Sequence, residues 1–129
     1  MSLISIYIGG VLTLFMAVVH TRYYKFFRWK AEFRKVSELN QKVFYTIHLA
    51  LLLLFFVIGT LTLVYAEFLS RSEGMALGFN LLVALLWLWR AVWQVFYFKS
   101  KELMHFLFML HFFVTSLAYF IPVIIKLTN

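Results

Sequence analysis

The chain has 129 residues, of which 64% are hydrophobic and only 13% are charged, with a mean hydropathy of +0.92. A water-soluble domain of this size could not bury so much apolar surface, so the composition excludes the soluble globular classes. The net charge of +7 comes from basic residues that flank apolar stretches. Anionic lipid headgroups are therefore their expected partners, and we do not expect nucleic-acid binding.

Four apolar stretches are each close to the ~20 residues that a helix needs to cross a bilayer. They cover about residues 3–24, 43–68, 75–98 and 102–125. The stretches are continuous and lack the alternation of a membrane β-barrel. The sequence therefore predicts an all-α integral membrane protein, with a single domain over residues 1–129. We expect its four transmembrane helices to form an antiparallel up-down bundle.

The first span differs from a cleaved signal peptide in its charge order. No positive side chain precedes it, and the basic cluster follows it, so we interpret it as a retained helix. The segment 22–42 then alternates basic residues with aromatic ones. This pattern predicts a basic-aromatic interfacial helix between the first two spans, which would contact anionic headgroups. Ser37 and Asn40 are candidate caps for the second span.

Small residues and one proline punctuate the spans. Gly9, Gly10 and Gly59 could permit close approach of helices. The pair Gly74 and Gly78 matches a GxxxG motif, but a loop-to-helix transition explains it at least as well. Pro122 is expected to kink the last span near its outer end.

The basic residues of the loops predict the orientation. Nine of them lie in the first and third loops, whereas Arg71 and Lys126 are the two in the second loop and the C-terminal tail. Because basic loops stay inside, both termini are expected on the outer side of a bacterial-type inner membrane.

Polar side chains within the spans are the candidates for a functional site, because burying them in hydrocarbon is costly unless they are paired or hydrated. Six of them occupy a layer about 5–14 Å below the inner headgroups, as judged from the helical rise. They are His20, His48, Arg90, Gln94, His105 and His111. Each span contributes at least one, and Arg90 and Gln94 share one helix face because they are four residues apart.

The histidines suggest a haem or metal site, because imidazole is a common ligand of both. Two histidines from different helices would fit a bis-histidyl haem b, with Arg90 neutralising a propionate. The predicted ligands of a haem or transition metal are His20, His48 and His111, with Arg90 and Gln94 as further cofactor-binding residues. His105 lies nearest the headgroups and is expected to be a spectator. The layout resembles that of small haem-binding membrane proteins, although no motif identifies a family.

Other functions stay open beside redox or electron transfer. The chain offers no phosphate-binding glycine loop, no paired carboxylates and no aspartate for a catalytic triad, so no catalytic residues are indicated. The histidines could also form a hydrogen-bonded seam without any cofactor. In that case the protein would be an accessory subunit packed against other membrane subunits, or a homo-oligomer. An oligomeric proton-coupled transporter is a third possibility.

Overall fold

The computed structural model describes all 129 residues, and every regular element in it is helical. Four helices are long and apolar enough to cross a membrane, and they match the four predicted spans in number and order. They are α1 (Ser2–Phe26), α3 (Glu38–Val64), α5 (Met75–Trp93) with the π-helical turn η2 (Gln94–Phe98), and α6 (Leu103–Thr128). The predicted all-helical class is confirmed, and these helices are consistent with an integral membrane protein.

The second span is bounded differently from the prediction of 43–68. Helix α3 begins earlier, at Glu38, because Ser37 caps it by accepting a hydrogen bond from the Asn40 N–H at 3.4 Å. Asn40 itself lies inside the helix. Helix α3 ends at Val64, and a separate short helix, α4 (Ala66–Ser70), follows. Hydropathy locates the apolar stretch, but it cannot detect the break at Tyr65, because the residues around this break are apolar as well.

The prediction of one interfacial helix between the first two spans is wrong, because the segment is divided into separate short helical turns. Helix α1 ends at Phe26, and Arg28 adopts a left-handed conformation with φ of 53°. Two short helical turns follow, α2 (Trp29–Glu32) and η1 (Phe33–Lys35). Tertiary packing explains the break, because the Trp29 ring lies on α3, with its centroid 4.8 Å from Phe44 and 4.7 Å from His48.

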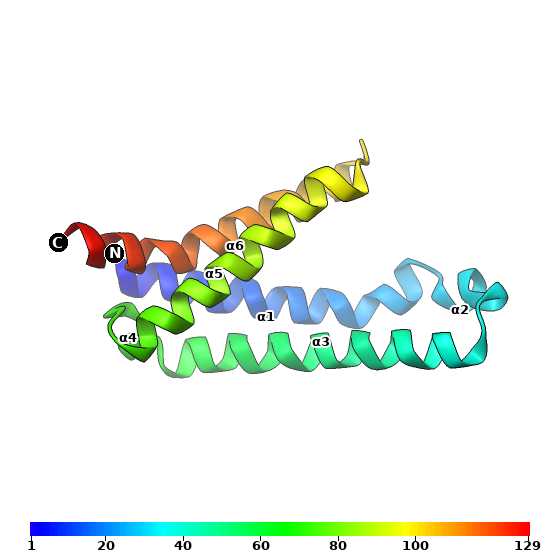
Figure 1. Ribbon diagram of the computed structural model, residues 1–129, viewed down its shortest axis with the longest axis horizontal. Coiled ribbons are helices and arrows are strands. Elements are labelled where there is room, and N and C mark those ends of the chain that lie inside the picture. The colour runs from blue at the N-terminus through cyan, green and yellow to red at the C-terminus, as the bar shows by residue number, and fades with distance from the viewer.

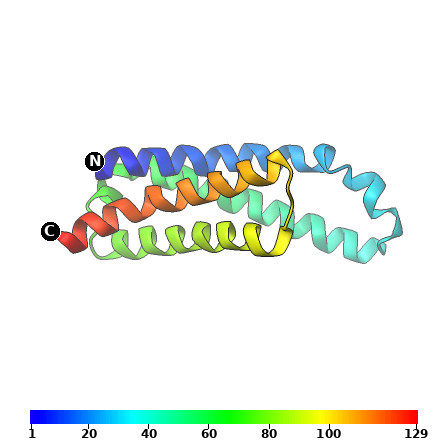
Figure 2. The ribbon, with the colours of Figure 1, turned by 90° about the horizontal axis from the view of Figure 1, so that it is seen from above.

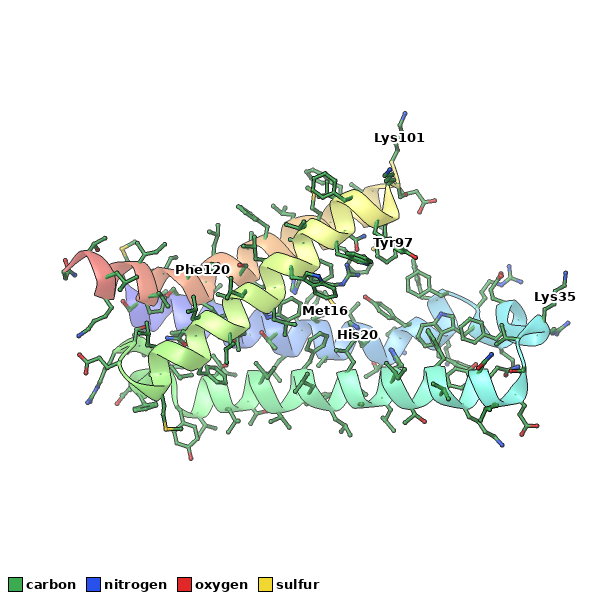
Figure 3. The ribbon with its side chains drawn as sticks, in the orientation of Figure 1. Met16, His20, Lys35, Tyr97, Lys101 and Phe120 are labelled. Atoms are coloured by element: carbon green, nitrogen blue, oxygen red, sulfur yellow. The ribbon has the colours of Figure 1, made fainter.

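The four long helices form two arms. Helix α1 packs along α3, α5 packs along α6, and α1 also contacts α6. Both termini lie at one end of the molecule, which we call the closed end (Figures 1 and 2). Toward the other end, the open end, the α1–α3 arm and the α5–α6 arm separate. Their tips, marked by Lys35 and Lys101, therefore lie apart (Figure 3).

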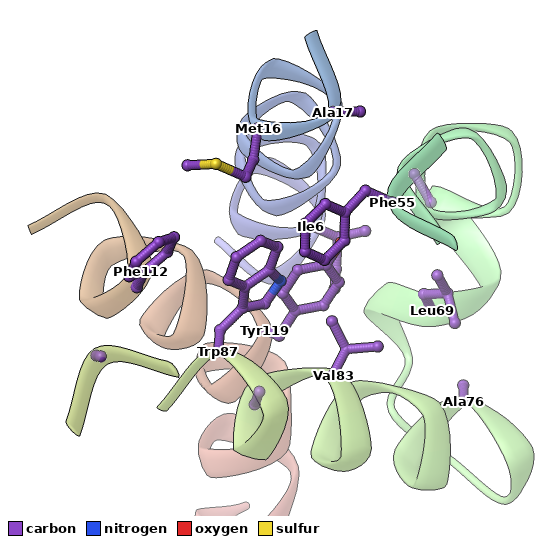
Figure 4. Packing of buried hydrophobic residues seen from close by; sticks show 13 residues of the cluster. Ile6, Met16, Ala17, Phe55, Leu69, Ala76, Val83, Trp87, Phe112 and Tyr119 are labelled. Carbon is purple, nitrogen blue, oxygen red and sulfur yellow. The ribbon is translucent and has the colours of Figure 1, made fainter. Parts of the chain in front are cut away.

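A buried aromatic core holds the arms together. Trp87 of α5 lies near its centre, with its ring centroid 5.0 Å from that of Phe55 on α3 and 5.7 Å from that of Phe112 on α6. Figure 4 shows Ile6 of α1 and Tyr119 of α6 in the same cluster. Side chains from all four long helices thus meet here.

Glycines allow the helices to approach closely, as predicted. A Cβ added at Gly9 would lie 2.9 Å from the Tyr119 ring, and one at Gly59 would lie 2.6 Å from the Leu14 side chain. Gly10 is similarly close to Leu63. The GxxxG pair is different, because Gly74 has a positive φ at the start of α5 and Gly78 has no neighbour within 4 Å of an added Cβ. The loop-to-helix interpretation of that pair therefore holds within this chain.

Candidate functional site

Three polar side chains near the open end form a hydrogen-bonded chain between α5 and α6. Arg90 donates from Nη1 to Gln94 Oε1 at 2.8 Å, and Gln94 Nε2 lies 3.0 Å from His105 Nδ1. Because Arg90 only donates, it fixes the orientation of the Gln94 amide, whose N–H group then points at His105. The Nδ1 atom of His105 is therefore the acceptor, and the proton of the neutral ring lies on Nε2.

Arg90 also lies between two aromatic rings. Its guanidinium carbon is 4.5 Å from the Phe112 ring centroid and 5.2 Å from that of Phe98, within the range of cation–π contact. The predicted face shared by Arg90 and Gln94 is thus present, and the charge has partners within the protein. None of these partners is anionic: the ion pairs of the structure are Lys42–Glu38 and Lys126–Glu73.

A second polar group joins α1 to α3. His20 Nδ1 lies 2.9 Å from the Met16 carbonyl oxygen, and His48 Nε2 lies 3.0 Å from the His20 carbonyl oxygen. Each of these nitrogens must donate, since a carbonyl only accepts. The second ring nitrogen, Nε2 of His20 and Nδ1 of His48, makes no hydrogen bond within the protein. The two ring centroids are 5.6 Å apart, with the planes at 16°.

These two groups face one cavity of about 560 Å³ between the arms, which we call the cleft. Its polar lining includes His20, His48, Arg90, Gln94 and His105, and its walls are largely aromatic. The aromatic residues are Tyr23, Phe26, Phe27, Trp29, Phe44, Phe98 and Phe108. Figure 3 shows His20 between the closed end and the arm tip at Lys35. All four long helices contribute to the cleft, whose volume is typical of a ligand site.

His111 lies outside the cleft. Its ring packs between Phe15 of α1, at 5.7 Å, and Trp87 of α5, at 6.1 Å, and it lines a separate cavity. Its Nε2 atom is buried without a hydrogen-bond partner, and so is Nε1 of Trp87. The structure thus groups His105, the expected spectator, with His20 and His48, and it separates His111 from them.

The predicted ligands His20, His48 and His111 line two different cavities of the structure. No group of three or more His, Cys, Asp or Glu side chains is close enough to hold a metal ion. The prediction ranked histidines by depth, but the rotation of α6 decides which of them faces the cleft. That rotation buries Phe112, Thr115, Ser116 and Tyr119 in the helix contacts.

Sequence reasoning also missed residues that shape the cleft. The basic-aromatic pattern of segment 22–42 predicts that its aromatic residues, Tyr23 and Trp29 among them, lie at the membrane surface. Instead, Trp29 is nearly buried on α3, and the Tyr23 ring centroid is 6.1 Å from that of Phe108 on α6. Glu102 also lines the cleft, beyond ion-pair distance from Arg90. The one sequence signal for an aromatic lining of the cleft is the high number of aromatic residues after the first span.

Comparison with protein-family models, curated proteins and solved structures finds no match to this chain. We therefore infer the function from the geometry of the cleft.

Proposed function

We propose that this protein is a small membrane protein that binds haem b in the cleft and serves electron transfer. One observation carries the proposal: the same aromatic-walled cavity is lined by an arginine without an anionic partner and by two histidines that each have one ring nitrogen free of hydrogen bonds. His20 and His48 would supply ligand nitrogens, and Arg90 would pair with a propionate. The haem itself would supply one-electron chemistry.

The hydrogen bonds of the histidines support this assignment. A metal-bound histidine usually donates its other ring nitrogen to a carbonyl or carboxylate, which fixes the tautomer and orients the ring. His20 and His48 each make such a bond to a backbone carbonyl. His105 differs, because its unprotonated nitrogen already accepts from Gln94. We therefore assign His105 to positioning Gln94 and Arg90 rather than to ligation.

The lining of the cleft suits the macrocycle. Phe26, Phe27, Phe44 and Phe108 offer flat apolar surfaces, and they would keep water from the ligand. Arg90 is held by Gln94 and two aromatic rings, so an arriving carboxylate would meet a cation that is already oriented. A bidentate or single charge-assisted hydrogen bond to that carboxylate would be stronger than a neutral one.

We further propose the arrangement in the membrane. The four spans would cross in up-down order, with both termini outside and the open end of the cleft toward the cytoplasm of a bacterial-type cell. The basic residues support this, since the first and third loops carry nine of them and form the tips of the two arms.

Absorption spectroscopy of the protein purified from haem-supplied membranes tests the cofactor. We expect a Soret band in the native protein and loss of most bound haem in His20→Ala and His48→Ala. Arg90→Gln should bind haem more weakly than the native protein does. His111→Ala is the matched control, and it should keep haem because His111 lies outside the cleft. A native protein without a Soret band, or loss of haem confined to His111→Ala, would contradict the proposal.

The exposure of α3 favours a second candidate, an accessory subunit of a membrane complex or a homo-oligomer. In an 18-residue apolar stretch of α3, only 17% is buried inside the chain, whereas 33–39% is buried in the corresponding stretches of the other three long helices. A partner helix could cover this face. Purification in mild detergent separates the two candidates: a stable partner subunit or a second copy, together with absence of haem, would select the accessory role.

A further inference from the structure

A second cavity, of about 490 Å³, lies between α1 and α6. We call it the α1–α6 groove. It is separate from the cleft but shares a wall with it, made of Tyr23, Phe26, Met104 and Phe108. Eight of its ten lining residues are hydrophobic. The proposed haem site uses neither Arg22 nor His111, the remaining two.

The groove runs along the helices. On α1 its lining includes Phe15, Val19, Arg22 and Phe26, which are spaced four, three and four residues apart and so share one helix face. On α6 it includes Leu107 and His111, four residues apart. From Phe15 to Phe26 the helical rise gives a length of about 16 Å. An extended hydrocarbon chain parallel to a membrane-spanning helix fits such a shape.

The charge in the groove lies at one end. Arg22 is exposed and makes no ion pair within the protein. It lies one turn before the end of α1, in the segment where the basic residues begin. The opposite end, at Phe15 and His111, offers no cation. A ligand with an anionic group at one end and an apolar chain at the other matches this distribution.

From these features we infer that the α1–α6 groove binds one anionic phospholipid. Its phosphate would lie on Arg22, and one acyl chain would pass along Val19 and Leu107 toward Phe15. The acyl chain has no polar group to offer Nε2 of His111, so Arg22 supplies the main polar contact to the lipid. The polar residue of this site, Arg22, lies outside the cleft, so the lipid site does not use the proposed haem ligands.

Native mass spectrometry of the full chain, in a non-denaturing detergent with added lipid, tests this inference. The probes are phosphatidylglycerol and phosphatidylcholine with the same acyl chains. We expect one retained phosphatidylglycerol per protein, and a roughly fivefold weaker affinity for it in Arg22→Gln, as for the loss of one basic contact near an anionic surface. Lys30→Gln is the matched control, because it removes one charge from the same basic segment outside the groove.

A second variant tests the apolar part. Val19→Trp should fill the groove and displace phosphatidylglycerol while Arg22 stays in place, and circular dichroism checks that the variant keeps its helices. Equal affinity for the two lipids, an equal loss in Lys30→Gln, or full retention in a folded Val19→Trp would each overturn the inference. Because haem content is read separately in the same samples, failure of the lipid site is distinguishable from failure of the haem site.

Discussion

At the scale of single residues, Tyr119 joins three helices through one hydroxyl group. Its oxygen lies 2.9 Å from Oγ1 of Thr62 on α3 and 3.2 Å from Oγ1 of Thr13 on α1. Each threonine hydroxyl already donates to a carbonyl of its own helix, Thr13 to Gly9 and Thr62 to Ile58. The Tyr119 O–H is therefore the donor that the two threonine oxygens share. Between membrane helices there is no hydrophobic driving force, so such interhelical hydrogen bonds contribute to association together with van der Waals packing.

Tyr119→Phe should lower the free energy of unfolding by about 0.5–1.5 kcal/mol, because it removes this donor and leaves the ring in place. Titration with a denaturing detergent, followed by circular dichroism, measures the change. Tyr7→Phe is the control, since Tyr7 lies exposed on α1 and makes no side-chain hydrogen bond. Equal midpoints for the two variants would show that the shared hydroxyl contributes nothing measurable.

At the scale of elements, the connection between α4 and α5 is held from two sides. Asn80 of α5 donates from Nδ2 to the Leu69 carbonyl at 2.8 Å, which fixes the end of α4. The Glu73 carboxylate, in the loop before α5, accepts a hydrogen bond from Nζ of Lys126 near the end of α6. Lys126 thus ties the last helix to the start of α5 at the closed end.

The bond between Lys126 and Glu73 should make the closed end sensitive to acid. The hydrogen bond and the positive charge of Lys126 hold the pKa of Glu73 below its ordinary value of 4.5. A carboxyl with a depressed folded-state pKa stabilises the fold above its unfolded pKa, and the stabilisation is lost as the pH falls through the folded value. We expect the midpoint difference between the native protein and Glu73→Gln to be present at pH 7 and to vanish well below pH 4.5.

Thermal unfolding of both proteins in detergent, repeated across that pH range, measures the difference. The effect should be small and should shrink in high salt, because the pair is exposed. Glu67→Gln serves as the control, since Glu67 is an acidic residue of the same end without an ion-pair partner. A midpoint difference that does not depend on pH would rule out the ionic contribution.

At the scale of the whole molecule, the two arms separate toward one end, and that end carries most of the basic residues. The cleft lies between the arms, with Arg90 as the cation within it. An anionic ligand that enters from the open end would therefore pass from the basic loops to Arg90. The orientation of the protein in the membrane therefore decides on which side of the membrane such a ligand must be available.

Single-cysteine labelling can determine the orientation, and the chain suits it because it has no cysteine of its own. Ser2→Cys and Asn129→Cys should react with an impermeant reagent from outside intact cells. Lys35→Cys and Lys101→Cys, at the tips of the arms, should react only after the membrane is opened. The reverse pattern would place the cleft on the outer side and exclude the proposed cytoplasmic opening.

The sequence alone was sufficient for the number and order of the long apolar helices and for the absence of strands. The reason is physical: the length and continuity of apolar stretches respond to the bilayer thickness and not to tertiary contacts. It also placed Arg90 and Gln94 on one face, since the helical period fixes that relation. The close approach at Gly9 and Gly59 likewise followed from the lack of a side chain.

Only the tertiary structure decided which polar residues meet. His105 and His111 are both on α6, and the packing of Phe112 and Tyr119 sets its rotation so that His105 faces the cleft. The break after Phe26 depends on Trp29 finding Phe44 and His48 on another helix. Membrane helices are apolar on most sides, so no polar face marks their rotation, and contacts between distant residues must set it.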